Sequence, residues 1–569
     1  MMDRRSFMAA FSGTATAGTL FPGVLWALQQ QQQSRITVEM IRQAEQLAGL
    51  SFTDKEREEM ANSLNRNLQS YERLRAVDLP NAVPPAILFD PIPPGVRLDL
   101  PTEKRAPRYS RQTRVTAPKN LEDVAFRPVM ELAELIRTRQ VSPVALTEMY
   151  LDRLKRHDPQ LLAVVTLTED RAMAQARAAD ADIRAGRYKG PLHGIPWGAK
   201  DLLATKGIRT TWGASPYKDQ VIDEDATVVQ RLDAAGAILV AKLTMGALAQ
   251  GDRWFGGMTR NPWNPEQGSS GSSAGPGSAT AAGLVGFSIG TETQGSILSP
   301  STRNGVTGLR PTFGRVPRTG AMALSWSMDK IGPMCRSVED CAAVFAAIHG
   351  PDDYDLTIKD LPFNWDATLN PRTLKVGYLK SAFDRTDNNN TKAFDDAALE
   401  TMRRLGFILS EVDFSMELPV SALGIILSAE SAAAFDALTR GTQDDLMLPD
   451  PERSLWPNTF RTARFTPAVE YINANRVRTL VMQEFHKALG DRDVVIVPFN
   501  APGMIQLTNL TGHPAVVVPS GFRDDGTPVS ITFVGGLYKE AETLAVAKAF
   551  QDATDFHTRT PPAFTPVSD

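Results

Sequence analysis

The 569-residue sequence is poor in cysteine, in surplus charge and in long apolar runs. The spacing of its two cysteines, Cys335 and Cys341, suits no metal site. Its 61 Lys and Arg against 65 Asp and Glu give a formal net charge of −4, which favours neither nucleic acid nor an anionic membrane as a partner. Beyond the N-terminal stretch, no segment is long and apolar enough to span a bilayer.

The two cysteines are predicted to be buried thiols. Ser337 has the character of a helix N-cap, and Asp340 follows three residues later in an acidic variant of the capping box. This pattern places Cys341 inside the helix and Cys335 ahead of it. The alternative is a disulfide between them, which would be possible if the protein is exported from the cytoplasm.

The N-terminus carries a twin-arginine pattern, Asp3-Arg4-Arg5-Ser6-Phe7-Met8, followed by a weakly apolar stretch over residues 9–27. Glycines and a proline interrupt this stretch, and it falls short of the ~20 residues that a membrane span needs. We therefore expect residues 1–33 to be a secretion signal with a disordered start to the mature chain, cleaved near Ala27. A periplasmic or secreted location follows, with a disordered basic start as the alternative.

The length and the 42% hydrophobic content predict a large α/β domain with an appendage. Residues 34–79 predict a helical hairpin, in which Thr53 and Glu56 form a capping box. Residues 80–120 are rich in proline and predict an extended strap that wraps the main domain, with Ile87, Leu88 and Phe89 as apolar anchors.

Over residues 121–569, short apolar strands alternate with helices, which predicts a central mixed β-sheet covered by helices on both faces. Helices are expected over 131–139, 143–155 and 172–185, and strands over 161–167, 237–240, 374–378, 494–497 and 515–518.

Two glycine-rich serine turns, around Ser272 and Ser296, and an upstream lysine, Lys200, stand out in this domain. A serine hydroxyl is a poor nucleophile until a base takes its proton, and a lysine held neutral by burial can be that base. Glycines let backbone N–H groups converge on a developing oxyanion.

These motifs resemble those of the amidase signature family. The family's glycine-flanked Ser-Ser is met by Gly271-Ser272-Ser273, and its Gly-Thr-Asp-x-Gly-Gly-Ser by the sequence GTETQGS at residues 290–296. The resemblance covers about residues 129–550. It implies an amidase-signature fold for the catalytic domain at 121–569, with Ser296 as nucleophile, Lys200 as base and Ser272, behind a cis peptide bond, as proton shuttle.

The resemblance also implies an oxyanion hole made of the backbone N–H groups of Thr293, Gln294, Gly295 and Ser296, and no metal or organic cofactor. This chain departs from the family at three positions. Gln294 replaces a glycine, Glu292 an aspartate and Leu298 an arginine. We expect Gln294 to be tolerated and to project toward the pocket, and Arg303 or Arg310 to brace Glu292.

Three other interpretations are open. Residues 271–275 match the G-x-S-x-G elbow of α/β-hydrolases, which needs a histidine base, for which the candidates are His349, His486, His513 and His557. The chain could instead be a non-catalytic binding protein with the amidase fold. It could also be a glutamine-dependent amidotransferase-like subunit, because residues 36–77 resemble the small C subunit of the tRNA-dependent amidotransferase.

The interpretation we favour is an exported serine hydrolase that cleaves the carbon–nitrogen bond of a small-molecule amide, with esters as a second substrate class. Neither nucleic acid nor a membrane span is expected, and a homodimer is left open. Trp212, Met245, Trp254 and Phe255 are candidates for the lining of the substrate pocket, with core packing as their alternative.

Overall fold

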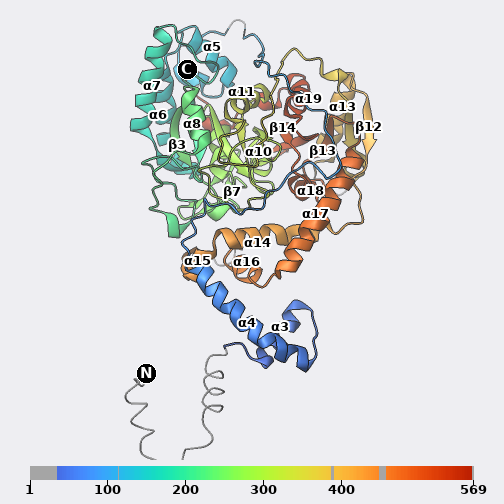
Figure 1. Ribbon diagram of the computed structural model, residues 1–569. Helices are drawn as coiled ribbons and strands as arrows, with labels where there is room; N and C mark the ends of the chain where they lie inside the picture. Colours follow the sequence, from blue (N-terminus) through green and yellow to red (C-terminus); the bar gives the residue numbers. More distant parts are fainter. Residues whose placement is uncertain (1–34, 113–114, 386–389, 448–455, 567–569) are drawn as a thin grey trace, which may run out of the picture. The chain divides into compact units, whose positions relative to one another are not determined.

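The computed structural model describes residues 35–112, 115–385, 390–447 and 456–566 (Figure 1). The chain divides into two units, residues 1–80 and 81–569, so the strap from residue 81 onward belongs to the same unit as the main sheet. The twin-arginine pattern and the expected cleavage near Ala27 lie outside the described residues.

The first unit contains the predicted helical hairpin. Helix α3 (Val38–Ala48) ends at Gly49, which adopts the left-handed conformation with φ of 66°. Helix α4 (Asp54–Arg75) begins at the predicted capping box, in which the Glu56 N–H donates to Thr53 Oγ1 at 3.3 Å and the Thr53 N–H donates to Glu56 Oε2 at 2.6 Å. Both helices and the capping box are confirmed.

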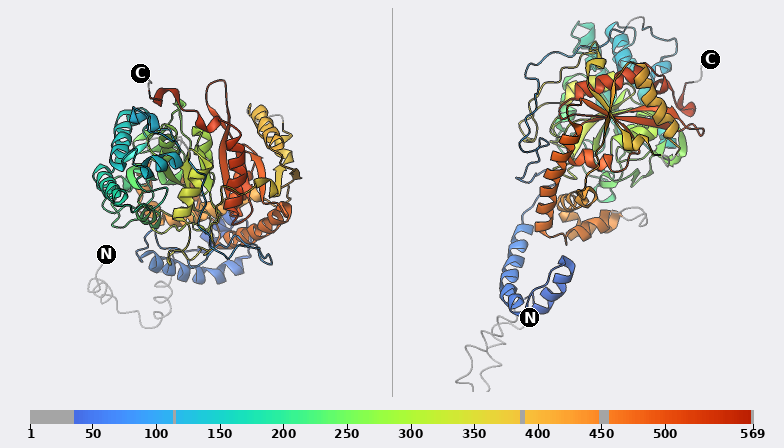
Figure 2. Two further views of the ribbon diagram at one scale, coloured as in Figure 1. Left: turned by 90° about the horizontal axis from the view of Figure 1, so that it is seen from above. Right: turned by 90° about the vertical axis from the view of Figure 1, so that its right-hand side faces the viewer.

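The second unit is built on an eleven-stranded mixed sheet, as predicted. Its strands, in order across the sheet, are β1 (Val164–Leu167), β3 (Ile238–Leu243), β2 (Pro196–Lys200), β8 (Phe287–Glu292), β10 (Lys330–Cys335), β9 (Thr307–Arg310), β14 (Ala515–Phe522), β15 (Pro528–Gly535), β13 (Val494–Pro498), β11 (Val376–Leu379) and β12 (Leu409–Val412). The right-hand view of Figure 2 shows the strands fanned out by the twist of the sheet. Two short hairpins lie outside the sheet: β4 (Arg253–Trp254) with β5 (Gly257–Met258), and β6 (Arg260–Asn261) with β7 (Asn264–Gly268).

Helices cover both faces of the sheet (Figure 2). Helix α7 contacts β3, α11 contacts β10 and α19 contacts β14. The helices of this unit are α5 (Val129–Arg137), α6 (Pro143–Leu161), α7 (Glu169–Arg184), α8 (Thr227–Ala234), α9 (Ala274–Ala281), α10 (Leu298–Asn304), α11 (Val338–Ile348), α12 (Lys380–Phe383), α13 (Lys392–Arg404), α14 (Gly424–Ala434), α15 (Asp436–Arg440), α16 (Trp456–Ala463), α17 (Ala468–Leu489), α18 (Met504–Leu510) and α19 (Glu540–Asp552). None of the helices in the described part of the chain has the length and apolarity to cross a membrane.

The pairing of four neighbouring strands, β3, β2, β8 and β10, positions the residues of the candidate site. Strand β2 lies between β3 and β8 and runs parallel to both, and β8 pairs with β10 in antiparallel fashion. Because parallel strands end at the same edge of a sheet, β2 and β8 end near each other, and the register pairs Ala199 of β2 with Ile289 of β8, so that β8 extends two residues further. Lys200 ends β2 and Glu292 ends β8, so both come to one edge of the sheet.

The boundary between α6 and β1 differs from the prediction. Residue 161 was expected to open a strand, but α6 continues to Leu161 and the strand begins only at Val164. The helix ends at Leu162, which takes a left-handed conformation and donates its N–H to the Asp158 carbonyl. The Asp158 carboxylate then accepts the N–H of Ala163 at 2.7 Å, so a local side-chain contact sets the boundary.

The strap runs without helix or strand over the described residues from 81 to 120. Asn81 exchanges two hydrogen bonds with the Ala323 backbone, at 2.7 and 2.9 Å. Phe89 packs edge-on against Phe313 with ring centroids 5.0 Å apart. The prediction that Ile87 and Leu88 are anchors is wrong, because they are 77% and 52% exposed. Because the strap is fixed at residues 81 and 89, the segment between them does not enter the core. Residues 84–88 instead line a cavity, which is described below.

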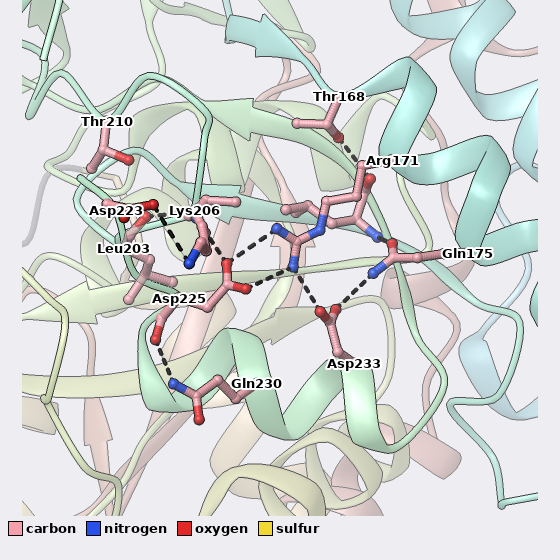
Figure 3. Close-up of polar contacts among 12 residues, drawn as sticks. Thr168, Arg171, Gln175, Leu203, Lys206, Thr210, Asp223, Asp225, Gln230 and Asp233 are labelled. Carbon is pink, nitrogen blue, oxygen red and sulfur yellow. Dashed lines mark hydrogen bonds and ion pairs between the residues drawn. The ribbon is translucent and has the colours of Figure 1, made fainter. Parts of the chain in front are cut away.

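A polar network holds the segment that follows β2 (Figure 3). Arg171 of α7 donates to Asp225 at 3.1 Å and to Asp233 of α8 at 2.6 Å. Asp225 also accepts the Lys206 N–H at 3.0 Å, and Asp233 accepts from Gln175 at 2.8 Å. The loop after β2 is thereby tied to two helices.

The prediction of two buried thiols is confirmed. Cys335 ends β10 and Cys341 lies in α11, and both are free and buried. The predicted capping box joins Ser337 and Asp340 at the start of α11.

Candidate active site

Lys200 is fully buried at the end of β2. Its Nζ lies 2.8 Å from Ser272 Oγ, 3.0 Å from Ser273 Oγ and 2.9 Å from Thr291 Oγ1. Burial lowers the pKa of Lys200 to about 7, although the negative charge of Asp329, like that of Glu292, raises it. A neutral amine has a lone pair, so the Ser272 hydroxyl can donate its proton to Nζ.

Ser272 lies in a turn whose backbone passes very close to a neighbouring loop. The peptide bond between Gly271 and Ser272 is cis, as the family resemblance implied. A Cβ atom at Gly271 would lie 1.8 Å from the Gly251 carbonyl oxygen, so only glycine fits there. Ser273 donates its N–H to the Ser296 carbonyl at 3.2 Å, which joins the two serine turns directly.

Ser273, which would be the nucleophile in the α/β-hydrolase interpretation, has a structural role instead. Its hydroxyl is fully buried, accepts the Thr291 N–H at 3.1 Å and donates to the Thr291 carbonyl at 3.1 Å. None of the candidate histidines, all within the described residues, forms a hydrogen bond with Ser272 or Ser273, and His513 instead bonds to Thr511. Ser273 is therefore not a nucleophile served by histidine.

Ser296 lies in the tight turn between β8 and α10. Gly295 before it has φ of +89°, a conformation that favours glycine. Ser296 is buried, with 9% of its surface exposed, and its hydroxyl forms no hydrogen bond with the described residues. The N–H groups of Gln294, Gly295 and Ser296 likewise donate to none of the described residues. This turn thus offers a hydroxyl and several N–H donors to a ligand.

The predicted relay from Ser296 through Ser272 to Lys200 is present only in part. Lys200 and Ser272 are hydrogen-bonded, and the two serine turns are joined through backbone, but no hydrogen bond links the two serine hydroxyls in the described chain. Catalytic hydrogen bonds often tighten only when substrate is bound. The roles of Lys200, Ser272 and Ser296, and the oxyanion hole of residues 293–296, stay predictions.

Glu292 organises the nucleophile turn. One oxygen of its buried carboxylate accepts the N–H groups of Ile297 and Leu298 at 2.9 and 3.0 Å, which caps the start of α10. The other accepts from Arg310 and Asn509, both at 2.8 Å. Burial alone would raise the pKa of Glu292, but Arg310, together with the Leu298 N–H and Asn509, lowers it to about 2.

The expected brace on Glu292 is therefore Arg310 rather than Arg303. Arg310 is fully buried on β9, whereas Arg303 is exposed and donates to Gln267 at 2.9 Å. Gln294 is tolerated, as expected, because its φ is not positive. Gln294 is exposed and does not line the cavity that borders Thr293, and its projection toward a substrate pocket stays a prediction.

Two residues near the site were missed from the sequence. Thr291 contacts Lys200 through its hydroxyl, as described above. Asp329 accepts the Thr293 hydroxyl at 2.6 Å and the N–H groups of Leu324 and Ser325 at 2.8 and 2.9 Å. Thr291 belongs to the 290–296 motif and could have been selected there, whereas Asp329 has no local signal and arrives through the pairing of β8 with β10.

The suggested pocket residues do not line that cavity. Trp212 and Met245 are buried, and Trp212 packs against Tyr217 with ring centroids 4.6 Å apart. Trp254 and Phe255 pack on each other at 4.8 Å, and none of the four is among the lining residues. For Trp212 and Met245, the alternative of core packing holds.

Comparison with known proteins identifies the protein family that this sequence matches. Residues 145–544 match the family described as Amidase. The A subunit of glutamyl-tRNA(Gln) amidotransferase from Methylococcus capsulatus is 35% identical over 479 residues, which cover 76% of this chain and 98% of that protein. The peptide amidase from Stenotrophomonas maltophilia is 30% identical with a TM-score of 0.66, covering 76% and 97% of the two chains. An amidase family protein from Bacillus anthracis is 26% identical with a TM-score of 0.69, covering 78% and 93%.

The pKa of Lys200 predicts how the reactivity of Ser296 depends on pH. The neutral amine accepts the proton and predominates above the pKa of about 7, so labelling of Ser296 by a fluorophosphonate should accelerate through that pH and then level off. Asp329→Asn should move this rise to lower pH, because the Asp329 charge raises the pKa of Lys200. Labelling rates measured from pH 5 to 9 check both points, and a maximum near pH 5 would contradict the neutral-lysine base.

The Glu292 network predicts a difference between two arginines. Arg310→Met leaves a buried carboxylate without its counter-charge, so the free energy of unfolding should fall by about 3–5 kcal/mol. Arg303→Ala is the matched control and should stay within about 0.5 kcal/mol, since it loses only an exposed contact. Denaturant unfolding gives both values, and equal losses in the two variants would refute the assignment of Arg310 as the brace.

Proposed function

Since this chain belongs to the amidase family, we propose that it is a serine hydrolase that cleaves the carbon–nitrogen bond of a small-molecule amide, with esters as a second substrate class. The observation that carries the proposal is the buried Lys200 amine, with a pKa of about 7, at 2.8 Å from the Ser272 hydroxyl. A buried lysine that is neutral near pH 7 can serve as the base for a serine without histidine.

In this mechanism, neutral Lys200 takes the proton of Ser296 through Ser272 as Ser296 Oγ bonds to the amide carbonyl carbon. The tetrahedral oxyanion is held by the N–H groups of residues 293–296. The C–N bond then breaks, and the leaving amine receives the proton back through Ser272. Water, deprotonated by the same relay, attacks the acyl-enzyme ester and releases the acid and Ser296.

A role within an amidotransferase is the second candidate, and it is supported by the names of the curated relatives. The hairpin of residues 36–77, which resembles the small partner subunit of that complex, is in keeping with this second candidate. The twin-arginine pattern at residues 3–8 favours the hydrolase, because it indicates export, whereas charged tRNA is cytosolic.

A hydrolysis screen of amides, anilides, esters and carbamates tests the reaction. We expect turnover of at least one uncharged amide, and a loss of about 10³-fold or more in Ser296→Ala, because the nucleophile is removed while the fold is kept. Variants of His349, His486, His513 and His557 serve as controls and should retain activity. Glutamine hydrolysis faster than that of every other amide would favour the amidotransferase instead, and full activity in Ser296→Ala would refute the proposal.

We also propose that the protein is exported to the periplasm or beyond by the twin-arginine route. The support is the Arg4-Arg5 pair with the short apolar stretch behind it. Replacing both arginines by lysine keeps the charge and should confine the protein, uncleaved, to the cytoplasm. Fractionation with immunoblotting reads this out, and equal export of both forms would contradict the proposal.

A further inference from the structure

A cavity of about 620 Å³ borders the nucleophile turn. Thr291, near the end of β8, and Thr293, in the turn itself, contribute to its lining. Thr291 also contacts the Lys200 amine at 2.9 Å, so the cavity ends one side chain away from the proposed base. Ser296 is not itself among the described lining residues, but Thr293, three residues before it, is, so the cavity reaches the turn that carries the proposed nucleophile.

The outer side of the cavity is made by the strap. Residues 84–88 line it together with apolar residues of the main domain, among them Met322, Trp326 and Ile331. Ile87 and Leu88 are 77% and 52% exposed there, and Tyr354 and Leu356, which also line the cavity, are 77% and 74% exposed. Exposed apolar side chains gathered around one opening are the mark of a binding surface.

The strap is held in position at both ends of this segment. Asn81 bonds to the Ala323 backbone at one end, and Phe89 lies between Phe313 and the Arg478 guanidinium, 3.6 Å above its ring, at the other. Pro84 and Pro85 restrict the backbone between them. A wall of this kind is preorganised, which reduces the entropy lost when a ligand binds.

The charged groups of the cavity are largely satisfied within the protein. Arg318 forms a bidentate pair with Asp355 at 2.8 and 3.0 Å. Asp329 accepts the three hydrogen bonds described above, and Lys330 donates to the Met328 carbonyl. Burial holds the pKa of Lys330 well below its ordinary value. In the described lining, no cation is left to pair with a substrate carboxylate, and Glu224 at the rim is exposed and acidic.

We propose that strap residues 84–88 form a wall of the substrate pocket, and that the substrate is an uncharged amide with a large apolar substituent, selected by Ile87 and Leu88. This inference rests on the proposed amide hydrolysis. The strap lies outside residues 145–544, which match the family, so the selectivity it gives belongs to this chain rather than to the shared domain. Glutamine, which carries two charges, would be a poor substrate for such an apolar pocket.

The first test compares substrates. Octanamide and N-octylacetamide extend the apolar group on the two sides of the amide, acetamide lacks it, and suberamate is as long as octanamide but ends in a carboxylate. We expect one of the two octyl compounds to exceed both acetamide and suberamate in kcat/KM by about tenfold or more. Preference for suberamate, glutamine or acetamide would overturn the inference.

The second test replaces the strap residues. Ile87→Ser with Leu88→Ser should lower the ratio of kcat/KM for the preferred octyl compound over acetamide by about tenfold, as expected for losing two apolar contacts. Ile408→Ser is the matched control, because Ile408 is 94% exposed and lies outside the cavity. An unchanged ratio in the double variant, or an equal fall in the control, would contradict the proposed role of the strap as a wall of the substrate pocket.

Binding to the Ser296→Ala protein separates the two proposals. Calorimetry with octanamide, N-octylacetamide and suberamate needs no turnover. Binding of an octyl compound that the strap variant weakens by about tenfold supports the pocket, even if no amide is hydrolysed, in which case only the proposed reaction fails. Hydrolysis at Ser296 without strap-dependent binding keeps the reaction and refutes the pocket.

Discussion

The burial of the Lys200 amine is the constraint on which the rest of the site depends. An ammonium ion held away from water is costly unless a carboxylate compensates it. The two carboxylates whose charges act on the amine, Asp329 and Glu292, each accept hydrogen bonds from other donors, and three hydroxyl groups lie around the amine instead. These surroundings favour a neutral amine, which is the form that can accept a proton. The turn of Ser272 is held to the amine by a hydrogen bond, and the turn of Ser296 is joined to it through the Ser273 N–H.

Glu292 is the second organising group, and it shows how this chain compensates for its departures from the family pattern. The arginine that the family carries at position 298 is a leucine here, and Leu298 is buried. The counter-charge comes instead from Arg310 on β9, a strand that reaches the site through β10. One carboxylate thereby joins the end of β8, the start of α10 and Asn509 of α18, and it holds the turn of Ser296 in place.

Much of the fold and of the candidate site could be predicted from the sequence, because the features concerned depend on neighbouring residues. The helical hairpin, the caps at Thr53 and Ser337, the apolar strands and the buried lysine each have a short signal. The features that escaped depend on distant pairing. Asp329 reaches the site through strand register, and the exposure of Ile87 and Leu88 follows from anchors at Asn81 and Phe89. The end of α6 escaped because the Asp158 side chain, not the apolar pattern, sets it.

The central claim is that neutral Lys200 is the base for Ser296. The most direct test replaces Lys200 with its thioether analogue γ-thialysine, which has the same length and a lower intrinsic pKa, and measures acyl-enzyme formation at Ser296 against pH. If Lys200 is the base, the midpoint of the pH profile moves to lower pH with the analogue. A midpoint that stays where it was would show that another group controls the proton, and would contradict the account.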